Sequence, residues 1–202
     1  MTSLMPATHT AFVDHALLAA GSLAEVALAA RRAADRDPGA AVFIYEDATG
    51  RAIDVDTRGT DAEIVARLPA PAPVEPEAEP EGSPALPRGR GRPRLGVVAR
   101  EVTLLPRHWE WLAGQPGGAS VALRKLVEQA RREHAGADAL RRGRDAAYAF
   151  MSAAAGNLPG FEEAARALYA GDMARLAAHT AGWPADVRAY ALRLAGAADA
   201  PA

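Results

Sequence analysis

The sequence predicts an α+β protein in three consecutive parts: a small α+β domain (residues 8–68), a linker (residues 69–94) and a mostly helical domain (residues 95–195). Eight prolines fall between Pro69 and Pro93 with four glutamates among them, a composition that buries too little apolar surface to fold. Residues 1–87 hold 6 Arg or Lys against 14 Asp or Glu, whereas residues 88–145 hold 13 against 6. We therefore expect a disordered linker between an acidic domain and a basic one.

The N-terminal domain has signals for two helices and four strands. A Ser/Thr-x-x-Glu capping box occurs at Ser22 and again at Thr60, so a helix is expected to begin at each position. The turn residues 47–50 predict a hairpin between the last two β-prone runs. We expect one small sheet with both helices on one face. Its strands are predicted at Thr10–Asp14, Leu17–Ala20, Ala41–Tyr45 and Ala52–Asp56.

The C-terminal domain is predicted to begin with a strand over Val97–Leu105, followed by helices opened by Pro106 and by glycine-containing turns. The expected helices are Arg107–Ala113, Ala119–His134, Asp145–Ala155, Phe161–Ala170, Met173–Thr180 and Pro184–Leu194. Small alanine side chains allow such helices to approach closely, so a few large residues must fill the core. These are Phe150, Phe161, Leu168, Tyr169, Trp183, Tyr190 and Leu194.

An arginine at every second position is the clearest candidate for a nucleic-acid contact. In an extended chain this period of two aims the side chains of Arg88, Arg90, Arg92 and Arg94 the same way. The core of this run, residues 90–93, resembles the Arg-Gly-Arg-Pro core of an AT-hook, which implies insertion into the narrow minor groove of A·T-rich DNA. The alternative is a solvated basic tether.

Residues 95–134 resemble a ribbon-helix-helix unit, with Val102–Pro106 as its strand and entry proline. The resemblance implies a homodimer in which two strands pair and enter the major groove. The expected interface residues are Val98, Val102, Leu104, Trp109, Leu123 and Leu126. The further expected DNA contacts are Arg100, Arg107, Arg124 and Lys125. If the strand's valines and leucine face the core, its groove face is Ala99, Glu101 and Thr103, which is poorly suited to reading bases.

Three blocks of sequence resemble a bacterial family known as domain of unknown function 2239. They are residues 91–112, 117–127 and 157–163, and the resemblance spans most of residues 10–195. It implies no activity, cofactor or catalytic residue.

Enzyme and metal-site signals are missing from the sequence, so we predict no enzyme, no catalytic residue, no metal and no cofactor. The five histidines have no ligand-like spacing. Asp54 and Asp56 are expected on the solvent face of an edge strand, and Asp47 beside them adds no complete ligand set. Glu162 and Glu163 are explained by the positive end of a helix.

The function predicted from the sequence is a cytoplasmic, regulatory DNA-binding protein that acts as a homodimer. No secretory signal or membrane span is expected. The competing hypothesis is a protein-interaction or antitoxin-like module that dimerises through the ribbon without reading DNA. In that case the basic segment binds an acidic protein partner or the acidic domain of its own chain.

Overall fold

The computed structural model describes residues 8–69 and 100–196, which divide between two compact units. Unit 1 comprises residues 1–69 together with 134–202, and unit 2 comprises residues 70–133. This division differs from the three consecutive parts expected, because the C-terminal helices belong to the same unit as the N-terminal sheet. The linker expected over residues 69–94 lies outside the described residues from residue 70 onward.

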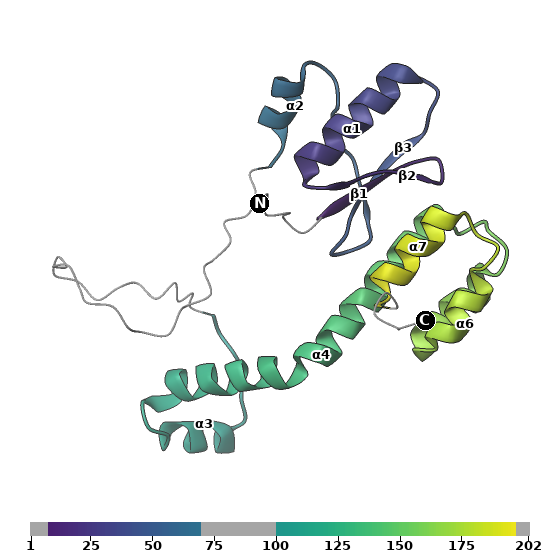
Figure 1. Ribbon diagram of the computed structural model, residues 1–202. Coiled ribbons are helices and arrows are strands. Elements are labelled where there is room, and N and C mark those ends of the chain that lie inside the picture. Colours follow the sequence, from purple (N-terminus) through teal and green to yellow (C-terminus); the bar gives the residue numbers. More distant parts are fainter. Residues whose placement is uncertain (1–7, 70–99, 197–202) are drawn as a thin grey trace, which may run out of the picture. The chain divides into compact units, whose positions relative to one another are not determined.

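Unit 1 is built on a four-stranded antiparallel sheet of order β2-β1-β3-β4. Figure 1 labels three of these strands, β1, β2 and β3. Its strands are β1 (His9–Val13), β2 (Ala16–Gly21), β3 (Val42–Glu46) and β4 (Ala52–Ile53). The four strands predicted for the N-terminal domain are confirmed in position. β4 is shorter than predicted because only Ala52 and Ile53 pair with β3, and no further strand follows β4 in the sheet order.

Two helices follow the predicted capping boxes. α1 (Leu23–Arg36) begins after Ser22, whose side chain accepts a hydrogen bond from the Glu25 amide, and α2 (Asp61–Arg67) begins after Thr60 in the same way. α1 lies across one face of the sheet, where its Val26 and Ala30 pack against Ala11 and Ile44 (Figure 1). The predicted cap of each helix is confirmed, and the physical reason is that the box satisfies otherwise unpaired amides.

The C-terminal part of unit 1 is helical, as predicted. It includes α5 (Phe161–Ala170), α6 (Met173–His179) and α7 (Ala185–Leu194). A single helix, α4 (Gly118–Ala154), replaces the two helices expected at Ala119–His134 and Asp145–Ala155. Gly143 lies in the expected break, but a Cβ there would come within 2.7 Å of the Leu194 carbonyl oxygen. This glycine therefore permits α4 and α7 to approach each other rather than ending the helix.

The second face of the sheet packs against these helices through aromatic rings. Phe12 and Tyr45 of the sheet meet Phe150 of α4 and Tyr190 of α7, with ring centroids 4.8–6.5 Å apart. Helices thus cover both faces, whereas the sequence predicted them on one. Of the predicted core residues, Phe150, Leu168, Trp183 and Tyr190 are buried, and Phe161 and Leu194 are partly buried. Tyr169 is wrong as a core prediction, because it lies on the surface against Tyr148.

The described part of unit 2 is α3 (Pro106–Ala113) followed by the first part of α4. Pro106 occupies the first turn of α3, as expected for an entry proline. Gly117, the last residue of the turn between the helices, and Gly118, the first residue of α4, both have positive φ. The strand expected over Val97–Leu105 is not found in its described part, residues 100–105. The reason is that no other described segment of unit 2 is a strand with which it pairs.

Candidate nucleic-acid interface

Four of the predicted DNA contacts fall on described residues of unit 2. Arg100 precedes α3, Arg107 lies in its first turn, and Arg124 and Lys125 lie on α4; all four are exposed. The remaining four, Arg88, Arg90, Arg92 and Arg94, lie outside the described residues.

The four described cations form no ion pair with any described residue. Arg124 donates only to the Ser120 carbonyl oxygen, at 3.2 Å, within its own helix. By contrast, Arg131 of the same helix pairs with Glu128 at 3.3 Å. The predicted DNA-contacting side chains are thus free to meet an anion without first breaking a salt bridge in the described part of the chain.

The predicted interface residues of unit 2 are exposed or half-buried. Val102, Trp109 and Leu126 have 56%, 42% and 44% of their surface exposed. Leu104 and Leu123 are half-buried, and Val98 lies outside the described residues. Such a concentration of large apolar side chains in contact with water is typical of a protein interface.

A shallow groove of about 540 Å³ runs along α4 in unit 2. Its lining is mostly apolar and comes from Leu123, Arg124, Lys125, Val127 and Glu128. Every residue of α4 from 124 to 133 is exposed. This part of the helix therefore has no packing partner within the described part of its unit.

A buried polar cluster in unit 1 was missed by the sequence analysis, which treated Asp47 only as a turn residue or metal ligand. Asp47 Oδ1 accepts hydrogen bonds from the Thr10 and Tyr190 hydroxyls, both at 2.8 Å. The Arg193 guanidinium donates to Asp47 Oδ2 at 3.3 Å and lies 4.7 Å from the centre of the Tyr190 ring. Burial first, and then the hydrogen bond to the Asp47 carboxylate, raise the pKa of Tyr190 above its ordinary value.

This cluster joins segments that lie far apart in the sequence. Thr10 and Asp47 come from the sheet region, while Tyr190 and Arg193 are three residues apart on α7 and so share one helix face. Its donors and acceptors satisfy one another, which makes it a structural tie. No motif predicted it, because its residues have no recognisable spacing. In the described ranges, no group of three or more acidic or histidine side chains could hold a metal ion.

A second groove, of about 650 Å³, lies in unit 1 beside the edge strand β4. Its lining includes four half-buried apolar side chains, which we call its floor: Leu23, Ile53, Val55 and Leu68. Its polar and charged lining residues, which we call its rim, are His9, Glu46, Asp54, Asp56 and Arg67, and Pro69 also lines the groove.

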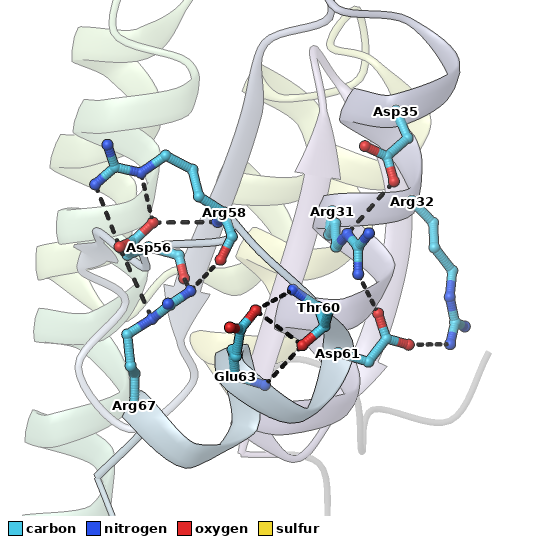
Figure 2. Close-up of polar contacts among 9 residues, drawn as sticks. All are labelled: Arg31, Arg32, Asp35, Asp56, Arg58, Thr60, Asp61, Glu63 and Arg67. Carbon is cyan, nitrogen blue, oxygen red and sulfur yellow. Dashed lines mark hydrogen bonds and ion pairs between the residues drawn. The ribbon is translucent and has the colours of Figure 1, made fainter.

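Asp56 on this rim is neutralised by two arginines (Figure 2). Arg58 donates to its carboxylate at 2.9 Å and Arg67 lies 3.8 Å away. The hydrogen bonds from Arg58 lower the pKa of Asp56 to about 2. Glu46 and Asp54 form no ion pair with a described residue, so the uncompensated negative charge of the groove comes from these two.

A neighbouring set of ion pairs joins α1 to α2 (Figure 2). Arg31 contacts Asp61 at 2.5 Å and also Asp35 at 3.4 Å, and Arg32 reaches the other oxygen of Asp61 at 3.5 Å. These exposed pairs orient α2 but contribute little to stability individually.

The fold and its surfaces define an α+β protein with a closed aromatic core in one unit and exposed apolar and basic side chains in the other. The chain belongs to the family described as "Uncharacterized protein conserved in bacteria (DUF2239)", whose model matches residues 8–195. No curated protein and no solved structure matches the chain. Within residues 8–69 and 100–196, every helix is too short or too polar to cross a membrane.

Proposed function

We propose that this protein is a homodimeric, regulatory DNA-binding protein whose unit 2 provides both the dimer contact and the DNA contact. The observation that carries the proposal is the burial pattern of unit 2. Among its described residues only Leu112 and Ala122 are buried hydrophobics. Its exposed large hydrophobics are Val102, Leu105, Trp109, Trp111, Leu126 and Val127.

A helical hairpin of this size is below the length at which a chain usually folds on its own core. Unit 2 therefore gains the most stability when its exposed apolar side chains are buried against a partner. Trp109 lies one turn from the buried Leu112, so it extends the same face of α3. Leu123, Leu126 and Val127 follow the spacing of one face of α4. A second copy presents the same side chains and covers both helices in a two-fold arrangement.

The DNA contact is supported by the unpaired cations of the same unit. Arg100, Arg107, Arg124 and Lys125 are close in sequence to the expected dimer contact, so dimerisation doubles the number of cations that meet phosphates. The expected ribbon and the AT-hook-like insertion of the residue 88–94 run remain parts of this proposal. The ribbon needs a second chain to form, and the insertion needs DNA.

The dimer is tested on the full-length chain by light scattering. We expect about twice the monomer mass of 21.1 kDa for the wild type and a shift to monomer for Trp109→Ala with Leu126→Ala. Tyr169→Ala is the matched control, because Tyr169 is an exposed aromatic residue of unit 1. A wild-type monomer at micromolar concentration would refute the dimer.

DNA binding is tested by fluorescence anisotropy with duplexes at about 50 and 200 mM salt, a range over which phosphate contacts weaken strongly. Arg124→Ala with Lys125→Ala should weaken binding to A·T-rich and G·C-rich duplexes equally, because phosphate contacts carry no sequence information. Arg90→Ala with Arg92→Ala should weaken A·T-rich binding more. Arg166→Ala, an ion-paired arginine of α5, is the control. A chain that binds neither duplex at 50 mM salt refutes DNA binding.

The second candidate function is a protein-interaction module. It is favoured by the mostly apolar groove on α4, where Arg124 and Lys125 flank Leu123 and Val127. Dimerisation without any DNA binding in the two experiments above is the outcome that supports it.

A further inference from the structure

We propose that the groove beside β4 in unit 1 is a docking site for the basic segment of the same chain, residues 84–94. The docking makes the arginine run unavailable to other partners. This inference rests on the proposed function for its regulatory consequence, because only a DNA-binding chain has DNA binding to inhibit. The docking itself is independent of DNA.

The first argument is charge. Glu46 and Asp54 stand on the rim of the groove without a cationic partner among the described residues, whereas the third carboxylate, Asp56, is already held by Arg58 and Arg67. The groove therefore presents two uncompensated negative charges. The segment carries arginines at 88, 90, 92 and 94 and no acidic residue between residues 84 and 94.

The second argument is the match of apolar parts. The groove floor of Leu23, Ile53, Val55 and Leu68 is apolar and half-buried. Leu86 and Pro87 immediately precede the arginines in the sequence. These two side chains cover the floor, while the arginines that follow them reach the carboxylates on the rim. An apolar floor or an acidic rim alone would fit many segments. The two together match this segment, in which apolar residues are followed directly by arginines.

The third argument is the path of the chain. Pro69 lines the groove, and it is the last residue of the first range that the structure describes, residues 8–69. The basic segment begins fewer than twenty residues later, and this length spans up to roughly 60 Å when extended. Closing so short a loop costs little entropy, and a tethered segment acts at an effective millimolar concentration. A weak surface contact is sufficient for docking under these conditions.

The docking is tested with a full-length chain in which Arg88, Arg90, Arg92 and Arg94 are replaced by Ala, so that its own segment leaves the groove free. The probe is a fluorescent peptide of residues 84–95. We expect saturable binding that weakens with salt, and a loss of about three- to tenfold when Glu46→Gln and Asp54→Asn are added. Glu162→Gln, which neutralises an exposed carboxylate of α5, is the control and should have no effect. Peptide binding that is absent, or equal in all three proteins, overturns the inference.

The regulatory consequence is tested in the chain with its arginines intact. Glu46→Gln with Asp54→Asn should tighten duplex binding about three- to tenfold at 50 mM salt. The melting temperature should change little, because Asp54 is exposed and the amide oxygen introduced at position 46 still accepts the hydrogen bond that the Thr49 hydroxyl donates to Glu46. Peptide docking by a chain that never binds DNA supports the groove and refutes the proposed function. DNA binding that these substitutions do not change, with no peptide docking, supports the function and refutes the groove.

Discussion

Units 1 and 2 contain similar kinds of residues but bury them to very different extents. In unit 1, Phe12, Phe150 and Leu168 are almost completely buried, and the sheet is covered by helices on both faces. In unit 2, two tryptophans and four large aliphatic residues are exposed among the described residues. In unit 1 the alanine-rich helices are covered by segments that are distant in sequence, whereas the described residues of unit 2 include no such segment of that unit.

The substitution with the largest expected effect on stability lies at the centre of the aromatic core of unit 1. Phe150 is 0% exposed and contacts the rings of Phe12, Tyr45 and Tyr190. Phe150→Ala should lower the free energy of unfolding by about 3–5 kcal/mol, because it removes buried surface and leaves a cavity. Chemical denaturation measures this loss. Trp109→Ala, a truncation of similar size in unit 2, should change the unfolding of unit 1 by less than about 0.5 kcal/mol; equal losses would contradict the comparison.

Gly50 tests how closely the sheet region and α4 pack within unit 1. It has a φ of +65°, and a Cβ there would overlap the backbone carbonyl of Ala146. Gly50→Ala should cost about 2–4 kcal/mol, the sum of backbone strain and overpacking. Thermal or urea unfolding reports the loss. The matched control is Gly171→Ala, where φ is +73° but no atom lies within 4 Å, so only the smaller backbone cost applies.

A substitution at Asp47 tests the hydrogen-bonded cluster that links the sheet region of unit 1 to α7. Asp47→Ala leaves the Thr10 and Tyr190 hydroxyls without their acceptor in a buried site. We expect a loss of about 1–3 kcal/mol in the free energy of unfolding. Asp54→Ala removes an exposed carboxylate that has no ion pair in the described chain, and it should have almost no effect. If both substitutions cost the same, the tie does not stabilise the unit.

The smallest expected effect is a loss of stability in alkali. The pKa of Tyr190 is raised above its ordinary value of 10.0, so unfolded chains ionise at a lower pH than folded ones. The contribution of Tyr190 to the free energy of unfolding is therefore complete below pH 10. It is lost as the pH rises through the pKa of the folded state, by at most about 1.4 kcal/mol per pH unit. Denaturation at pH 9 to 11 measures it. Tyr190→Phe should make the decline shallower, with a remainder from Tyr45, whose pKa burial also raises.

The sequence by itself determined the local structure of this protein. Capping boxes at Ser22 and Thr60, the turn at residues 47–50 and the entry proline Pro106 each act through nearest neighbours, and each is found where it was predicted. It also predicted the exposed cations Arg124 and Lys125 on α4, since a charged side chain seeks water wherever the fold allows it.

Only the tertiary structure decided which segments pack together. The Pro- and Glu-rich composition suggested that the chain separates at residues 69–94, yet Asp47 bonds to Tyr190 and Phe12 packs on Phe150 across that boundary. Two helices were expected at Ala119–His134 and Asp145–Ala155, but the single helix α4 runs through both ranges, and its Gly143 permits the close approach of α4 and α7. The physical reason is that burial, non-local hydrogen bonds and close helix contacts depend on pairs of residues that are distant in sequence. Local propensity and spacing contain no information about such pairs.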